Sequence, residues 1–285
     1  MQISTTEKPL IGTYCNCCRK PAFQSSYCDE FKGLPLVFCR NCGHLQVSIV
    51  PSPEELSDYY STSYSLSRGK YVDKAYERVM EMRAEAQYQF IDAHLKESPA
   101  NICDYGAGYG YLVARFLKSD IVAFGYESDG ECIRVAKEKS LDIKPSPKTL
   151  GAAELPHVNL LCMSHVLEHL PDPEEFLQQL QGIVPCVFIE IPVYSSHLVK
   201  QFVDQEGHLN FFTEKSFCSF ISNIAGVELT AIERCGPSLE RYWHPSLRNI
   251  IVNRISRRLS GDWFFDQYGT NGDGMWLRAL VNLDV

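Results

Sequence analysis

Residues 104–110 read DYGAGYG, an acid followed by three glycines at alternate positions. It follows the apolar residues 101–103 (NIC) and leads directly into residues 111–117 (YLVARFL), whose apolar side chains have helical spacing. A glycine-rich turn between a strand and a helix lets the backbone approach a ligand closely, with helix N–H groups pointing outward. The stretch therefore predicts a ligand-binding loop.

From residue 101 onward, short apolar runs alternate with segments of helical periodicity. Strands are expected at 101–106, 121–127, 158–164 and 186–192, and helices at 111–118, 130–140, 173–182 and 213–226. Two late strands, 227–233 and 275–283, are expected to complete the sheet, and residues 71–96 predict one long helix before it. Such alternation predicts an α/β fold, with a mostly parallel sheet and helices on both faces.

Twelve cysteines occur in the chain, and half of them lie in the first 42 residues. Two C-x-x-C pairs, Cys15 with Cys18 and Cys39 with Cys42, are separated by 20 residues. This spacing is typical of a four-thiolate zinc site, in which the protein fills every position on the ion, so the metal serves folding and not chemistry. Free cysteines in a core are the alternative, which the polar flanking residues disfavour.

The composition is that of an ordinary globular protein: 285 residues, 45% of them hydrophobic, with a formal net charge of −8. That charge disfavours a nucleic-acid partner, which needs basic stripes to neutralise its phosphates. No apolar run approaches the ~20 residues of a membrane span, and the first residues lack the apolar stretch of a signal peptide. We expect a cytoplasmic protein without a membrane span.

Differences in composition and hydrophobic periodicity along the chain predict three parts. Residues 1–55 are expected to form a zinc-binding module, 56–98 a tyrosine-rich linker and helical lid, and 99–285 the cofactor-binding domain. A substrate-binding insert is expected at about 236–274, between the last two strands. The first part has too few periodic segments to build a core of its own, so it needs the metal as a staple.

The glycine loop lacks the G-K-[ST] ending of a P-loop and the G-x-G-x-x-G spacing of a dinucleotide fingerprint. Its D-x-G-x-G-x-G pattern resembles motif I of class I S-adenosylmethionine-dependent methyltransferases. The resemblance implies a Rossmann-like sheet of seven strands, one of them antiparallel, with S-adenosylmethionine bound at the loop. Glu127, which ends the next strand, lies where that family places the acid for the ribose hydroxyls. The implied cofactor-binding residues are Asp104, Gly106, Ala107, Gly108, Gly110, Glu127, Ser128 and His165.

Residues 165–170, HVLEHL, resemble the segment after the fourth strand of these methyltransferases, which lines the pocket between cofactor and substrate. His165 and His169 lie four positions apart and would share one face if the segment were helical. A purely structural role is the alternative for each histidine.

The order of the motifs narrows the resemblance. The four-cysteine segment, a tyrosine-rich stretch, motif I, HVLEHL, FIEIP and GHLNFFT together resemble the zinc-containing methyltransferases that include sugar C-methyltransferases, over residues 15 to about 235. In that family the tyrosines fold over the active site, the histidine ending the HVLEH-type motif contacts substrate, and a later histidine is a candidate general base. The matching residues are Tyr59, Tyr60 and Tyr64 as a group, His169 and His208. Tyr64, His169 and His208 are therefore the catalytic candidates.

Two departures separate this chain from the sugar C-methyltransferases. That family usually carries Tyr and Glu just before the last histidine, whereas this chain has Gln205 and Gly207 there, with Glu206 displaced by one. The sequence also shows no counterpart of that family's C-terminal α/β domain. Proton abstraction from a sugar carbon is therefore disfavoured, and methyl transfer to oxygen or nitrogen is favoured over carbon. For a hydroxyl acceptor, His208 is the favoured base and His169 the alternative.

The acceptor hypothesis rests on a local basic segment. Residues 234–258 carry six arginines and a single acid, Glu240. Guanidinium groups clamp phosphates, so the segment predicts a site for the diphosphate of a nucleotide-activated sugar or another anionic acceptor; a solvated helix face is the alternative. We expect methyl transfer to a small molecule, a carbohydrate or nucleotide sugar. The alternatives are a protein or nucleic-acid methyltransferase that recruits through the zinc module, a sugar C-methyltransferase, and a non-catalytic binding module.

Overall fold

The structure is a computed structural model that describes residues 15–20, 30–31, 34–48, 51–58, 74–147, 157–194, 207–238, 272 and 274–283. The tyrosine group Tyr59, Tyr60 and Tyr64 lies outside these residues, as does most of the insert expected at about 236–274. Of the six arginines in residues 234–258, only Arg234 is described.

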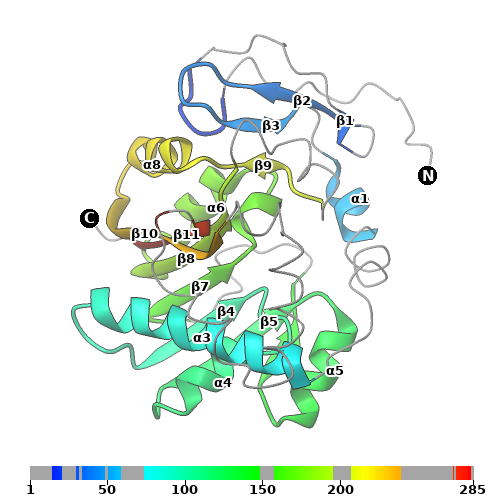
Figure 1. Ribbon diagram of the computed structural model, residues 1–285, viewed down its shortest axis with the longest axis vertical. Coiled ribbons are helices and arrows are strands. Elements are labelled where there is room, and N and C mark those ends of the chain that lie inside the picture. Colours follow the sequence, from blue (N-terminus) through cyan, green and yellow to red (C-terminus); the bar gives the residue numbers. More distant parts are fainter. Residues whose placement is uncertain are drawn as a thin grey trace, which may run out of the picture.

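A seven-stranded sheet forms the centre of the molecule, with the strand order β10-β11-β8-β7-β4-β5-β6 (Figure 1). Its strands are β4 Asn101–Tyr105, β5 Val122–Glu127, β6 Ile143–Pro145, β7 Leu160–Ser164, β8 Cys186–Pro192, β10 Glu228–Ser238 and β11 Gly274–Asn282. β11 runs antiparallel to both of its neighbours, and the remaining strands are parallel to one another. The expected Rossmann-like α/β sheet of seven strands, one of them antiparallel, is confirmed.

The order of the strands reverses in the middle of this sheet. The chain runs from β4 outward to β5 and β6 and then returns to β7, which pairs with the other side of β4. In open parallel sheets the carboxyl ends of the strands at such a reversal leave a crevice in which ligands bind. The glycine loop follows β4 and the HVLEHL segment follows β7, so both lie at this position.

Helices cover both faces of the sheet (Figure 1). α3 Lys74–His94, α4 Tyr111–Leu117 and α5 Gly130–Glu138 lie on one face, and α6 Pro173–Leu180 and α8 Glu214–Asn223 on the other. Strand side chains alternate between the two cores, so that Leu160 and Cys162 pack on the α3 side while Leu161 and Met163 pack on the α8 side. All four are fully buried, which explains why β7 reads as a continuous apolar run.

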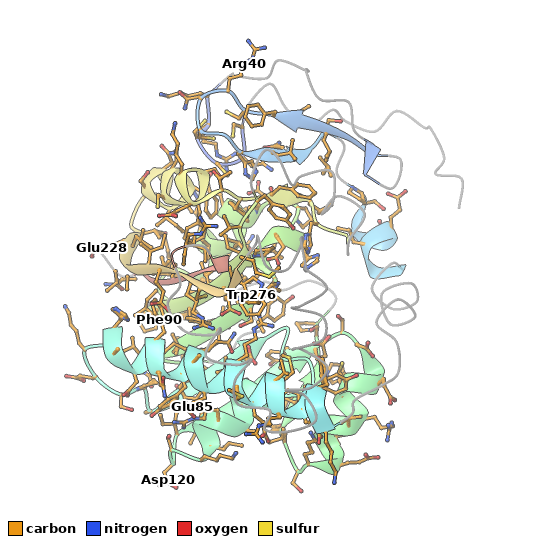
Figure 2. The ribbon with its side chains drawn as sticks, in the orientation of Figure 1. Arg40, Glu85, Phe90, Asp120, Glu228 and Trp276 are labelled. Atoms are coloured by element: carbon orange, nitrogen blue, oxygen red, sulfur yellow. The ribbon has the colours of Figure 1, made fainter. Side chains whose placement is uncertain are left out.

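A buried ion network ties α3 to the sheet. The carboxylate of Glu190 on β8 accepts hydrogen bonds from Arg83 (2.8 Å from Nε) and Gln87 (2.9 Å) of α3, and from Arg278 of β11. Burial alone would raise the pKa of Glu190, but the guanidinium groups of Arg83 and Arg278 lower it to about 2. Arg83 also lies over the ring of Trp276, 4.6 Å from its centroid, and Figure 2 shows Trp276 beside α3. Glu190 is therefore ionised and shared by three elements.

A second, four-stranded sheet joins distant parts of the chain. β1 Glu30–Phe31, β2 Leu34–Phe38 and β3 Leu45–Val47 come from the cysteine-rich segment, and β9 Asn210–Phe211 comes from the region after β8. β3 and β9 pair antiparallel, with Leu45 opposite Phe211 and Gln46 opposite Asn210. This sheet packs above α8 (Figure 1), and the short helix α1 Pro53–Asp58 follows it in the chain. None of the helices that the structure describes combines the length and apolar character needed to cross a bilayer.

Candidate active site

The glycine loop after β4 depends on backbone angles that favour glycine. Gly106, Gly108 and Gly110 have φ values of 80°, 54° and 78°, all in the left-handed region. A Cβ atom at Gly106 would lie 2.5 Å from Cγ2 of Val166, so the loop packs directly against the HVLEHL segment. A Cβ atom at Gly108 would meet nothing within 4 Å. The loop is therefore open at Gly108, whereas at Gly106 it packs against the segment that follows β7.

Glu127 connects the loop to the end of β5. Its Oε2 accepts a hydrogen bond from the Gly108 N–H at 2.6 Å, and its Oε1 accepts from the N–H groups of Ser128 (2.7 Å) and Asp129 (2.9 Å). Ala107 of the loop packs closely on β5, because a Cβ atom added at Gly125 would lie 2.6 Å from the Cβ atom of Ala107. Glu127 thus holds the loop in place, and it also lies where the sequence predicts the ribose-binding residue.

Asp104 is the second acid at this edge of the sheet. Its side chain is buried, and among the described residues nothing donates a hydrogen bond to Oδ1. Burial, and then the charge of Glu127, raises the pKa of Asp104 to about 7. A cationic ligand beside it would favour the ionised form, because an opposite charge lowers the pKa of a carboxyl group.

The HVLEHL segment is not an α-helix. His165 has a φ of 56°, in the left-handed region, so the chain turns there after β7. Residues Leu167–His169 then form a short 3-10 helix. The condition under which His165 and His169 would share one face, a helical segment, is therefore not met. Nδ1 of His165 lies 3.5 Å from Oε1 of Glu168, and its ring meets the edge of Trp276 at 5.5 Å, whereas Nδ1 of His169 contacts the Gly207 carbonyl at 3.4 Å.

His169 instead meets His208, the other histidine expected at the active site. Their ring centroids lie 4.6 Å apart, and Nε2 of His208 is 4.0 Å from Oε1 of Glu168. One potential ligand atom from each of Glu168, His169 and His208 lies within 4.8 Å of the others. We call these three residues the histidine–glutamate cluster. Glu168 is completely buried and His208 is 6% exposed, whereas His169 is half-buried, so the cluster reaches solvent on the His169 side.

Two residues in and around the histidine–glutamate cluster were not predicted from the sequence. Glu168 lies inside HVLEHL but was not singled out, and Tyr194, whose hydroxyl hydrogen-bonds with Nδ1 of His208, follows the strand FIEIP by two residues. The only signal for Glu168 was its position beside His169. Tyr194 and His208 are separated in the chain by residues 195–206, which lie outside the described residues, so no local pattern could have indicated their contact.

The segment that carries His208 is held by the cysteine-rich part of the chain. The Val47 N–H donates to the Leu209 carbonyl at 3.0 Å, and the Leu209 N–H donates to the Glu168 carbonyl at 2.9 Å. Nδ2 of Asn16 donates to Oδ1 of Asn210 at 3.3 Å. The segment that follows His208 is therefore held by the cysteine-rich part on one side and by the Glu168 backbone on the other.

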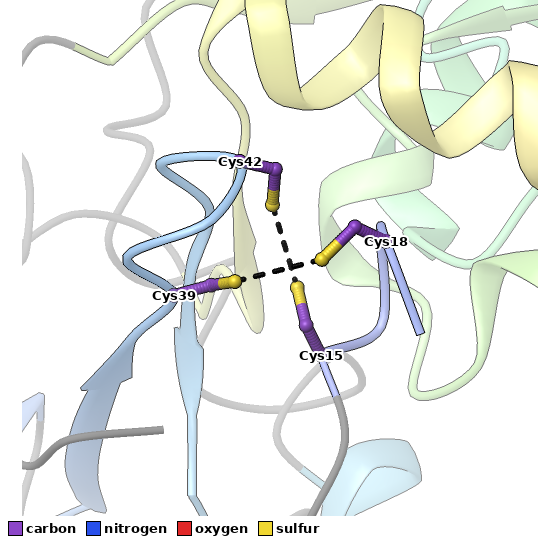
Figure 3. A group of neighbouring side chains, drawn as sticks. All are labelled: Cys15, Cys18, Cys39 and Cys42. Carbon is purple, nitrogen blue, oxygen red and sulfur yellow. Dashed lines mark hydrogen bonds between the residues drawn. The ribbon is translucent and has the colours of Figure 1, made fainter. Parts of the chain in front are cut away.

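The four cysteines predicted as metal ligands come together. The Sγ atoms of Cys15 and Cys42 are 3.6 Å apart, as are those of Cys18 and Cys39, and Figure 3 shows all four pointing to a common centre. This is too long for a disulfide, which needs about 2.05 Å, and close to the roughly 3.8 Å edge of a tetrahedron with Zn–S bonds of about 2.3 Å. All four side chains are buried. The donor set and spacing fit zinc.

One described cavity lies between α3 and α4 and extends to Gly110 at the end of the glycine loop. It has a volume of about 520 Å³. Its lining includes the charged side chains of Glu81, Glu85, Arg115, Lys118 and Lys139. The predicted anion clamp includes Arg234, which is among the described residues. The Arg234 side chain donates a hydrogen bond to the Gly274 carbonyl at 3.1 Å.

Comparison with known proteins bears on this arrangement. A family model described as "Methyltransferase domain" matches residues 76–227. The chain is similar to a SAM dependent methyltransferase from Archaeoglobus fulgidus, with 16% identity and a TM-score of 0.50 over 71% of this chain and 94% of that one. It is also similar to magnesium protoporphyrin IX methyltransferase from Synechocystis PCC 6803 with bound SAH, with 9% identity and a TM-score of 0.51 over 81% and 99%. These structural likenesses concern the fold. No curated protein matches the sequence significantly.

Proposed function

The chain belongs to the methyltransferase-domain family and is an S-adenosylmethionine-dependent methyltransferase; from this premise we propose that its acceptor is a small molecule of carbohydrate or nucleotide-sugar type. The methyl group is transferred to oxygen or nitrogen in preference to carbon. One observation supports the placement of the reaction: the glycine loop packs through Gly106 against Val166, and the same short segment continues into the histidine–glutamate cluster. Cofactor loop and activating side chains are thus neighbours.

In this proposal the cofactor lies across the carboxyl ends of β4 and β5. When bound, S-adenosylmethionine supplies a methyl group on a sulfonium. Glu127 would accept hydrogen bonds from the ribose hydroxyls, Asp104 would hold the ammonium group, and the backbone at Gly108 would bind the methionine portion. Ala107, Gly110, Ser128 and His165 complete the proposed binding residues.

Replacing Glu127 with alanine is expected to weaken S-adenosylhomocysteine binding by roughly 10- to 150-fold. The estimate corresponds to the loss of hydrogen bonds to a charged group, about 1.5–3 kcal/mol, and the loop also loses the bond from Gly108. Isothermal titration calorimetry measures the change. Glu131→Ala, which removes an exposed acid paired with Arg134 on α5, is the matched control and should leave the affinity unaltered. Equal affinity in both variants would remove Glu127 from the cofactor site.

On the acceptor side, the protein aligns a nucleophile with the methyl group and excludes water. For a hydroxyl acceptor, the O–C bond forms as the C–S bond breaks, S-adenosylhomocysteine leaves, and the hydroxyl proton has to be removed. We propose that the histidine–glutamate cluster activates that hydroxyl and that His208 is its most important member. The surrounding aromatic side chains of Tyr194 and Phe211, with ring centroids 6.0 and 6.2 Å from that of His208, limit the access of water.

The acceptor class rests on the basic segment 234–258 and is tested by a screen. Purified protein is incubated with S-adenosylmethionine and a panel of nucleotide sugars, free sugars and glycans, and products are analysed by mass spectrometry. We expect one class to gain the mass of one methylene group per transfer, with S-adenosylhomocysteine formed in equal amount. If peptides or nucleic acids are methylated and no carbohydrate is, the alternative of a macromolecular acceptor replaces this proposal.

Zinc at the four cysteines is the structural part of the proposal, and Cys39→Ser tests it. Freshly purified protein should contain one zinc ion per chain, and the variant should lose it, because three thiolates and a hydroxyl make a much poorer site. Elemental analysis gives the metal content and circular dichroism follows the N-terminal part. Cys218→Ser on α8, outside the cluster, should keep its zinc. Native protein free of zinc would rule the site out.

A further inference from the structure

The histidine–glutamate cluster has the composition of a metal site of its own. Two imidazoles and a carboxylate converge from two segments of the chain, Leu167–His169 and the residues before β9, with one ligand atom of each within 4.8 Å of the others. Nitrogen and oxygen donors of this kind suit zinc, iron, cobalt or nickel. Three protein ligands leave positions on the ion open, as in catalytic metal sites.

Both imidazoles are oriented as ligands usually are. Nδ1 of His169 contacts the Gly207 carbonyl at 3.4 Å, and Nδ1 of His208 hydrogen-bonds with the Tyr194 hydroxyl. Metal-binding histidines commonly use one ring nitrogen for such an outer contact, which fixes the ring and directs the other nitrogen at the ion. The geometry thus assigns the ligand role to Nε2 of each ring.

The spacing inside the cluster favours a shared cation over direct hydrogen bonds. Nε2 of His208 and Oε1 of Glu168 are 4.0 Å apart, beyond the 3.2 Å limit of ordinary N–H···O bonds. The edge of a tetrahedral site with nitrogen and oxygen ligands is about 3.4 Å, so a small closure brings both atoms onto one ion.

We propose that Glu168, His169 and His208 bind one divalent transition-metal cation, and that the acceptor hydroxyl occupies an open position on it. This role rests on the proposed function, although cation binding itself does not. A hydroxyl bound to such a cation has a lowered pKa, so its proton leaves to solvent and the oxygen then attacks the methyl carbon. His208 and His169 act as ligands in this scheme, in place of the general base that the sequence suggests.

The chain would then hold two metals of different chemistry. Zinc at the four thiolates is closed and structural, whereas the cluster is open and has only nitrogen and oxygen donors. Cobalt separates the two sites by spectroscopy, because thiolate ligands add strong near-ultraviolet charge-transfer absorption that imidazole and carboxylate lack. The proposal is therefore testable in the full, zinc-loaded protein without acceptor or cofactor.

The experiment titrates Co²⁺ into the zinc-loaded protein while visible and near-ultraviolet spectra are recorded. We expect one further Co²⁺ per chain, with visible d–d bands and no thiolate charge transfer. Glu168→Gln and His169→Ala should weaken this binding at least tenfold. Tyr194→Phe, which removes the outer contact to His208, should weaken it by about 10- to 100-fold. His94→Ala, at the exposed end of α3, is the matched control and should bind as the wild type does.

Each outcome decides the question. Binding only with thiolate bands, no binding beyond the zinc, or equal binding in Glu168→Gln and wild type would overturn the proposal. Calorimetry with S-adenosylhomocysteine on each variant shows whether the fold is retained, so a weakened Co²⁺ site cannot be mistaken for unfolding. If Co²⁺ binds as expected but the acceptor screen shows no transfer, only the proposed function fails. Transfer at full rate in protein with the cluster stripped of metal and the zinc retained would contradict the metal's role.

Discussion

Glu190→Gln should lower the free energy of unfolding by about 3–5 kcal/mol. The substitution keeps the shape of the side chain but leaves Arg278, which is fully buried, and Arg83 facing a neutral group. Removing one partner from a buried ion network costs this much because the remaining charges lose their principal counter-ion, although Arg278 keeps a 3.8 Å contact with Glu233. Urea denaturation followed by circular dichroism measures the change.

Glu85→Gln is the matched control for Glu190→Gln. It removes the same charge from a pair with Arg115 that also joins α3 to its neighbour, but the Glu85 side chain is 44% exposed. Exposed pairs contribute about 0–1 kcal/mol, so its effect should be small. A similar loss in both variants would mean that the Glu190 network contributes no more than a surface ion pair.

The same network predicts how stability depends on pH. Because the folded-state pKa of Glu190 is about 2, below the ordinary 4.5, its ionisation stabilises the fold above about pH 4.5. That contribution is lost as the pH falls from 4.5 toward 2. In Glu190→Gln this part of the acid sensitivity should be absent.

His208→Ala should reduce the turnover rate by about 10²-fold or more while S-adenosylhomocysteine affinity stays within twofold of wild type. The imidazole acts on the acceptor and not on bound cofactor, so its loss appears in the chemical step. Steady-state kinetics with the acceptor found in the screen, together with calorimetry, separates the two quantities. His94→Ala serves again as the control.

The comparison with His169→Ala shows which histidine dominates. If His208→Ala retains near-normal turnover and His169→Ala is inactive, the leading role moves to His169. If both retain activity, alignment of the acceptor with the methyl group carries the reaction without activation by the cluster. The role of Tyr64, which lies outside the described residues, stays a prediction.

The main sheet was predictable because its central strands β7 and β8 are buried on both faces and read as continuous apolar runs. β4, β5, β7 and β8 lie at or within two residues of the expected bounds, and the helices between them follow their apolar periodicity. β9 was not predictable, since a strand of two residues carries no periodic pattern and exists only through its pairing with β3. β6, of three residues, was missed for the same reason.

The site was predictable in its parts but not in its assembly. The glycines and the two strand-end acids follow from local pattern, whereas the proximity of His208 to Glu168 depends on contacts between residues about 40 positions apart. In the HVLEHL segment the four-residue spacing predicts a shared face only for a helix, and His165 adopts a left-handed conformation instead. Its backbone is fixed by a hydrogen bond from its N–H to the Glu190 carbonyl, at 2.7 Å.

The cysteine-rich part emerges as a support for the active site. Its strand β3 holds the Leu209 carbonyl through Val47, and the same peptide segment carries His208. We therefore propose that the module of residues 1–55 contributes to positioning, and that loss of zinc in Cys39→Ser is felt at His208. Such coupling would appear as a lower turnover rate with cofactor affinity retained.

We expect the cofactor to lie between the glycine loop and the histidine–glutamate cluster, and a crystal structure of the complex with S-adenosylhomocysteine decides this. The ribose hydroxyls should lie on Glu127, the backbone of Gly108 should lie against the methionine portion, and the sulfur should face the side of the loop where Val166 leads to Glu168 and His169. Density for the ligand in the cavity between α3 and α4, with Glu127 and Gly108 free of it, would show that the cofactor site is placed wrongly.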